Sequence, residues 1–162
     1  MAERRDNEVA KAHPMSRASP EMQDLARRLL AFEAARGNSS AARADAAAQV
    51  IEGLRLHLIK LAGVAGFRSL LSRALTLAGA EAPSLKIVRV RTDGSLEGFD
   101  GIEGSREGEA GAEAVQAGMV LVANLLELLV TFIGEPLTLR LVKVTWPDAS
   151  MDKGNLITEE NP

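Results

Sequence analysis

The first strongly patterned stretch of the chain has the spacing of a helix. Apolar residues recur there three or four positions apart, at Met22, Leu25, Leu29 and Phe32. Ser19 can cap the first turn, Pro20 suits the first helical position, and Gly37 closes the stretch. We therefore expect a helix that begins near Ser19 and ends near Gly37.

Two further helices are expected before Gly79. The earlier one should begin at 38–40 and end near Ala62. Its apolar residues lie on two nearly opposite arcs, the first with Val50, Ile51, Leu54, Leu58 and Leu61 and the second with Leu56 and Ile59. This pattern predicts a helix that is covered on two sides. Gly63 and Gly66 then indicate a short turn, after which a helix should run from Phe67 to Gly79.

A β-hairpin is expected over residues 85–99. The run from Leu85 to Val90 is rich in β-branched residues and leads to Asp93-Gly94, a dipeptide that favours a tight hairpin turn. An isolated hairpin is marginally stable, so this one should pack on the helices or on another chain. Residues 100–111 are acidic and rich in glycine, and we expect a mobile loop there.

The most apolar stretch, from about Glu113 to Ile133, predicts one long helix. Its polar residues fall within roughly a quarter of the circumference and are Glu113, Gln116, Asn124, Glu127 and Thr131. A narrow polar stripe is typical of a central helix that touches water along one edge. A membrane-spanning helix would carry Glu127 near its middle at a high energetic cost, so spanning is not favoured.

The final apolar stretch, residues 137–146, is ambiguous. Leu137, Leu139 and Leu141 alternate as in a strand, whereas Leu137, Leu141 and Val144 follow helical spacing. We favour a helix, because Pro136 is well placed as a first helical residue.

These elements together predict a mainly α fold, a four- to five-helix bundle with one small β-hairpin insertion. A chain of 162 residues, 46% of them apolar, can form one domain with its own core, which we assign to residues 19–147. Residues 1–18 and the acidic residues 148–162 lack a periodic apolar pattern and are predicted to be flexible tails.

The composition indicates the expected cellular location and the distribution of charge. The chain has no cysteine, which excludes disulfides and thiolate chemistry. No export signal is recognised, so the expected location is the cytoplasm, and the preference for Arg over Lys suggests a bacterial source. Basic residues predominate over 27–73 and acidic residues over 93–113, and these regions could attract each other or different partners.

The chain carries no recognised catalytic, metal-binding or phosphate-binding motif. We therefore assign no catalytic, metal or cofactor residue, expect no cofactor, and do not expect an enzyme. His57 lies at the edge of an apolar arc, where its ring can pack while its tip meets water, and a metal site would need more ligands.

A pocket between helices is the alternative hypothesis. Glu127 and Asn124 are polar groups in an otherwise apolar helix and could line such a pocket. The candidate pocket or interaction residues are Asn124, Glu127, Thr131, His57 and Trp146. They would belong to a small-ligand sensor or an enzyme.

Association with other polypeptides is the favoured function. Ala110, Ala114 and Gly118 form a small-residue ridge that allows close approach of a second helix, from this chain or from another copy. We expect a non-enzymatic interaction or regulatory module, an oligomer such as a homodimer or an accessory subunit of a bacterial assembly. Nucleic-acid binding is not favoured, because aromatic residues are scarce. A third hypothesis is peripheral membrane association through the long helix.

Overall fold

The computed structural model describes residues 18–36, 46–98 and 108–149, and of residues 108–113 the backbone alone. The described chain is mainly helical, with one small antiparallel sheet. Its elements are α2 (Pro20–Arg36), α4 (Ala46–Glu81), the 3₁₀ helix η2 (Pro83–Ile87), β1 (Arg89–Val90), β2 (Leu96–Glu97), α6 (Gly108–Ile133) and α7 (Glu135–Thr145). The mainly α fold with a small hairpin is confirmed. The predicted tails lie almost wholly outside the described residues.

Helix α2 has the boundaries and the cap that the sequence predicts. The Ser19 hydroxyl accepts the N–H of Met22 at 3.3 Å, which satisfies one free donor of the first turn. The predicted apolar stripe faces the core: Met22, Leu25 and Leu29 are buried, and Phe32 is partly buried against them.

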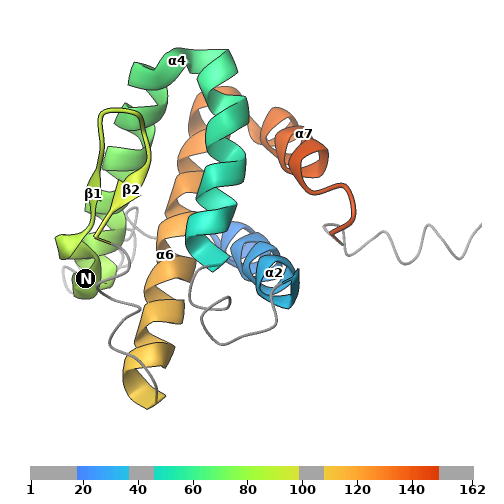
Figure 1. Ribbon diagram of the computed structural model, residues 1–162. Helices are drawn as coiled ribbons and strands as arrows, with labels where there is room; N and C mark the ends of the chain where they lie inside the picture. The colour runs from blue at the N-terminus through green and yellow to red at the C-terminus, as the bar shows by residue number, and fades with distance from the viewer. Residues whose placement is uncertain (1–17, 37–45, 99–107, 150–162) are drawn as a thin grey trace, which may run out of the picture.

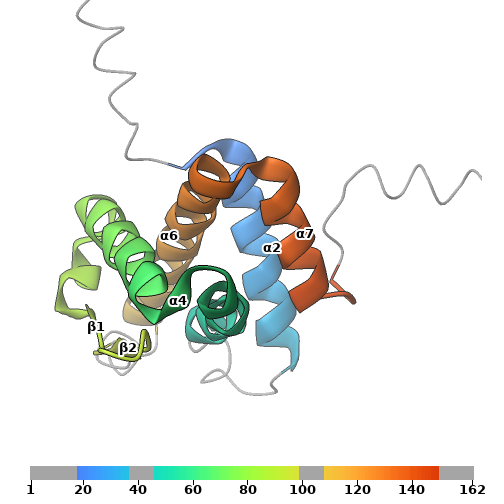
Figure 2. The same ribbon diagram turned by 90° about the horizontal axis from the view of Figure 1, so that it is seen from above.

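The two helices predicted around Gly63 meet there at a sharp kink and together carry the label α4. Gly63 has φ 80° and ψ 166°, a backbone conformation that side chains disfavour, and the helix changes direction there. Figures 1 and 2 show the two halves of α4 running away from this kink at different angles, with α6 beside both of them. Buried residues from both halves, such as Leu54 and Leu71, contribute to one core.

The second predicted arc on the first half of α4 is only partly covered, because Ile59 packs partly buried against the core while Leu56 is exposed. Leu54 and Leu58 are buried, but Leu56 is 55% exposed and Leu61 is 60% exposed. Helical spacing shows which arcs are apolar and does not show how many of them have a neighbour. Helix α4 contacts α2, α6 and α7, yet Leu56 and Leu61 stay exposed.

The hairpin is confirmed, although it is shorter than predicted. Arg89 pairs with Glu97 and Val90 pairs with Leu96 in the antiparallel register. Residues 85–87 belong to η2 and form no strand, because Pro83 starts a 3₁₀ turn. The hairpin packs on the helices, as expected: β1 contacts α4, and the Arg55 guanidinium donates to the carbonyl of Asp93 at 3.0 Å.

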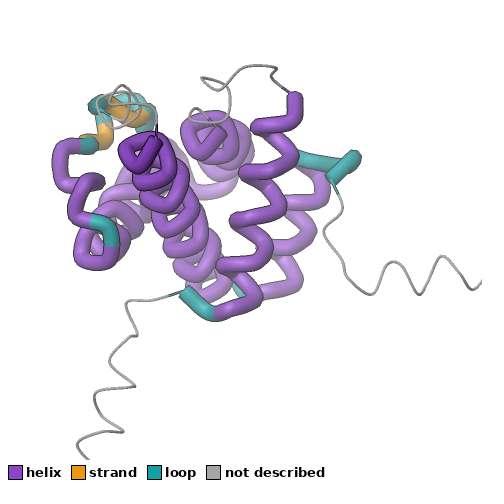
Figure 3. Tube along the Cα trace, turned by 90° about the horizontal axis from the view of Figure 1, so that it is seen from below, coloured by secondary structure: helices purple, strands orange, loops and turns teal. Residues whose placement is uncertain are grey.

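Helix α6 is the central element and supplies much of the core, including Leu121, Leu125 and Leu129. It begins at Gly108, so residues 108–111 are helical and do not belong to the predicted loop; residues 99–107 lie outside the described part. Figure 3 shows the other described helices packed around it. The long helix predicted from Glu113 to Ile133 is confirmed.

Residues 135–145 form helix α7, which resolves the ambiguity of that stretch. Gly134 (φ 90°) turns the chain between α6 and α7, and Pro136 lies in the first turn, as predicted. The helix lies on the same side of the molecule as α2 (Figure 2). Its inner face buries Thr138, Leu141 and Val142.

Candidate functional site

Glu127 joins the central helix to the start of α2. Its Oε1 atom accepts the backbone N–H of Ser19 at 3.0 Å, while the Ser19 hydroxyl caps the same helix. In a capping box, the carboxylate that binds the N-cap N–H comes from the third residue of the same helix. Here Met22 occupies that position, and Glu127 supplies the carboxylate from another helix. The Glu127 carboxylate therefore links the start of α2 to α6.

Asn124 departs from the predicted water-facing stripe, because its side chain is only 3% exposed. Its Nδ2 atom donates to the carbonyl of Val120 at 2.9 Å, one turn earlier in the helix. Thr131 is exposed, and its hydroxyl donates to the carbonyl of Glu127 at 3.1 Å. Within the predicted stripe, the Asn124 amide is therefore buried, the Glu127 carboxylate joins two helices, and the Thr131 hydroxyl is exposed.

His57 lies at the contact between α4 and α7. Its Nδ1 atom is 3.3 Å from the carbonyl oxygen of Gly53 and 3.3 Å from the hydroxyl of Thr145. The Thr145 hydroxyl already donates to the carbonyl of Leu141 at 2.8 Å. Both neighbours of Nδ1 therefore accept, and the neutral ring fits best with its proton on Nδ1. This arrangement joins the two helices.

Trp146 packs the end of α7 against α2 and α4. It is buried, and its Nε1 atom donates to Oε2 of Glu33 on α2 at 2.8 Å. Its ring also packs close to Gly53 of α4, where an added Cβ would come within 3.1 Å. Glu33 in turn lies 3.5 Å from the guanidinium of Arg36.

Three of the five candidate residues make their contacts with different elements. Glu127 meets α2, Asn124 bonds within α6, and His57 lies at the contact between α4 and α7. None of the five is among the described residues that line the main hollow. Among the described residues there is also no group of three or more side chains able to hold a metal ion.

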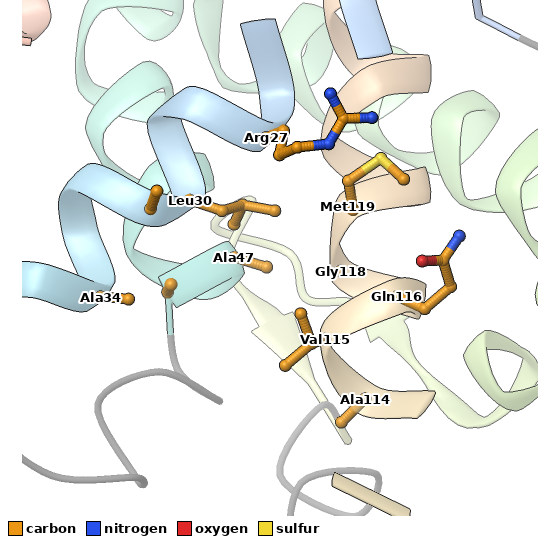
Figure 4. A pocket seen from close by; sticks show the side chains of 11 residues that line it. Arg27, Leu30, Ala34, Ala47, Ala114, Val115, Gln116, Gly118 and Met119 are labelled. Atoms are coloured by element: carbon orange, nitrogen blue, oxygen red, sulfur yellow. The ribbon is translucent and has the colours of Figure 1, made fainter. Parts of the chain in front are cut away.

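The hollow lies between α2, the start of α4 and the first half of α6 (Figure 4). Its volume is about 360 Å³. Its described lining is apolar apart from Arg27 and Gln116, and consists of Arg27, Leu30, Ala31, Ala34, Ala46, Ala47, Ala114, Val115, Gln116, Gly118 and Met119. Its described lining can receive an apolar group and offers no pair of reacting side chains.

The small-residue ridge falls partly in this hollow. Ala114 and Gly118 are buried and line it, opposite alanines of α2 and α4. The side chain of Ala110 is outside the described part. Ala114 and Gly118 of the ridge therefore face other helices of this chain. Contact of the ridge with a second copy stays a prediction.

A second candidate surface lies where α4 bends and where α6 turns into α7. We call it the apolar end and define it as Leu61, Val64, Phe132 and Leu137, which flank Gly63 and Gly134. All four side chains are exposed, Leu61 by 60% and Phe132 by 62%. Figure 1 places both joints at its upper end. Sequence periodicity missed this surface, although apolar residues on both sides of a helix-breaking glycine were a usable signal.

Cations border the apolar end. Lys60 precedes Leu61, and Arg140 and Lys143 lie on the outer face of α7; all three are exposed. None of them forms an ion pair with a carboxylate of the described residues, whereas Arg27, Arg36, Arg55 and Arg91 each do. Glu135 is the acidic residue at the start of α7. The border therefore carries more positive than negative charge.

No protein-family model, curated protein or solved structure is significantly similar to this chain. The candidate sites consequently rest on their own geometry.

Within the described residues, one stretch, Ala114–Ile133 of α6, is long and apolar enough to cross a membrane. The core helix of a soluble protein meets the same criteria, and 61% of its most apolar window is buried by other parts of the chain. The stretch is thus weak evidence for a membrane span.

Proposed function

We propose that this chain is a non-enzymatic interaction module that binds another polypeptide through the apolar end. The observation that carries the proposal is the exposure of Leu61 and Phe132, each two residues from a glycine at which the chain changes direction. Burying a large apolar side chain is worth roughly 1.5–3 kcal/mol. Clustered apolar side chains that remain in water commonly mark a surface for a partner.

The polar residues support a structural role over a catalytic one. Glu127, His57 and Trp146 each contact a neighbouring helix through a polar side-chain atom, which favours a role in holding the helices together. The partner can be a second copy, giving a homodimer or higher oligomer, or another protein of a larger bacterial assembly.

The test compares two variants of the full chain by native mass spectrometry and sedimentation over a range of concentrations. Leu61→Asp with Phe132→Asp should abolish the bound or oligomeric species that the wild type forms. Ile87→Asp is the matched control, because Ile87 is 55% exposed but is the last residue of η2, away from both joints. A wild type that remains a bare monomer, including when recovered gently from its own cells, would contradict the proposal.

A second candidate function is the binding of a small apolar ligand in the hollow between α2 and α6. Its volume of about 360 Å³ falls within the usual range of ligand pockets, roughly 300–1,000 Å³. Octanoate is a suitable probe, since its chain matches the apolar lining and its carboxylate can approach Arg27. A rise in Tm with octanoate that is lost in Gly118→Leu would support this function, and an unchanged Tm would count against it.

Peripheral membrane association is the third candidate. The long helix uses its apolar face in the core, where Leu121 and Leu125 are fully buried. Membrane contact would therefore have to use the apolar end and its cations. Flotation with anionic liposomes that is lost in the Leu61→Asp, Phe132→Asp variant would support this alternative over a polypeptide partner.

A further inference from the structure

We propose that residues 150–162 of this chain bind the apolar end of the same molecule and cover it until a partner displaces them. The inference rests on the proposed function, because it names the regulation of that surface.

Residues 150–162 and the apolar end both carry apolar side chains. Residues 150–162 read SMDKGNLITEENP, with the adjacent pair Leu156-Ile157 and a further apolar residue at Met151. The apolar end offers exposed Leu61 and Phe132 as the facing surface. Removing both sets of side chains from water favours their contact.

Along α7 this surface has an extension. Leu137, Leu141 and Val144 are spaced as neighbours on one side of a helix. Leu141 is buried on the inner face of α7, whereas Val144 is 59% exposed. Val144 therefore continues the line of Leu137 toward the end of α7, where residue 150 follows within a few positions.

The charges are complementary as well. Residues 150–162 contain Asp152, Glu159 and Glu160 against the single cation Lys153. The border of the apolar end holds Lys60, Arg140 and Lys143 against Glu135 and, beyond Val144, Asp148. The same positive border disfavours a symmetric contact of two α7 helices across this face, because Arg140 lies midway between Leu137 and Val144 and would approach its own copy.

The chain is long enough for the contact. Leu137 and Val144 are seven residues apart on α7, a rise of roughly 10 Å. Seven residues also separate Ala149 from Leu156, and an extended chain of that length spans up to about 23 Å. Leu156 can therefore reach any point along α7.

The hollow between α2 and α6 is a poorer site for this segment. Arg27 is the cation among its described lining residues, and its guanidinium already lies 3.1 Å from a carboxylate oxygen of Asp24. An acidic segment would find little unpaired positive charge there. The apolar end is the site that matches both the charge and the apolar residues.

The absence of cysteine makes a direct test possible in the full chain. A spin label on Asn155→Cys should remove most of the NMR intensity from the methyl groups of Leu61, Val64 and Leu137. The methyl groups of Leu30 and Met119 in the hollow should keep theirs. Glu159→Lys with Glu160→Lys should restore the lost signals, while Lys153→Gln, the control, should not.

Equal intensities at the apolar end with and without the label would overturn the proposal, as would losses centred on the hollow. Mixing spin-labelled chain with isotope-labelled chain that carries no spin label separates the two sources of contact. Signal loss in the mixture would show a second copy as the binding site and would also overturn the same-molecule contact. Failure of the proposed function is distinguishable, because intramolecular losses can persist when no partner binds.

Discussion

Glu127 completes the cap of a helix to which it does not belong. Its carboxylate accepts the N–H of Ser19 at 3.0 Å, at the positive end of the α2 dipole, while Ser19 caps Met22. The contact joins residues 108 positions apart in the chain. It fixes both the start of α2 and its position along α6, so its removal should affect stability more than an ordinary surface change.

Replacing Glu127 by Ala should lower the free energy of unfolding by about 1.5–3 kcal/mol, the usual range for a hydrogen bond to a charged group. Glu127→Gln keeps an acceptor and should lose less. Urea unfolding followed by circular dichroism measures both changes. Gln116→Ala is the control, because Gln116 is exposed on the same helix. A Glu127→Ala protein as stable as this control would show that the cap contributes nothing.

Replacing Glu33 by Ala should loosen the end of α7. The Trp146 indole would lose its acceptor while remaining largely buried, and an unsatisfied buried donor costs about 1–3 kcal/mol. Trp146 is the single tryptophan of the chain, so its fluorescence reports on this contact alone. We expect a red-shifted emission maximum and a lower urea midpoint. An unchanged spectrum would mean that the indole is held by packing alone.

Gly63 and Gly79 should respond to alanine in opposite directions. At Gly63 an added Cβ meets nothing within 4 Å, but φ is 80°, so Gly63→Ala should destabilise by about 1–3 kcal/mol through backbone strain. Gly79 has no such φ and its Cβ would meet Lys86 at an ordinary 3.7 Å. Gly79→Ala should therefore stabilise the helix by up to about 1 kcal/mol. Thermal unfolding of the two variants provides the comparison, and equal shifts would contradict the kink geometry.

The hairpin turn should weaken in acid. Hydrogen bonds from the Ser95 hydroxyl and backbone N–H, with a smaller contribution from Arg55, hold the pKa of Asp93 below its ordinary value. A lowered folded-state pKa means that the stabilisation is complete above the unfolded-state pKa and is lost as pH falls through the folded-state value. The difference in stability between wild type and Asp93→Ala should shrink in that range. Chemical denaturation at a series of pH values checks it, and a constant difference would exclude this cause.

Local signals predicted most of the helices. Ser19, Pro20 and Gly37 gave the limits of α2, and Pro136 favoured the helical form of α7. These signals work because capping and proline geometry depend on a few adjacent residues. Residues 85–87 were wrongly placed in a strand, since their β-branched character did not outweigh the turn that Pro83 begins.

The candidate sites were less predictable, because they depend on which helices become neighbours. Periodicity placed Asn124 on a water-facing stripe, yet packing of other helices against α6 buries it. No pattern in the sequence relates Ser19 to Glu127 or Glu33 to Trp146. The exposure of Leu61 arises from the same cause: an apolar arc is visible in a sequence, whereas the absence of a cover over it is a property of the assembled fold.

The bend at Gly63 has a mechanical consequence. Without it, the 36 residues of α4 would form a rod of about 54 Å, longer than α6 at about 39 Å. With it, two stiff arms share one hinge, and their opening angle is held by the packing of both arms on α6. The hinge lies within the apolar end, so whatever binds there also contacts the pivot. By thermodynamic linkage, a ligand that prefers one opening angle shifts the arms toward it, and forcing the arms apart changes the affinity of the ligand by the same factor.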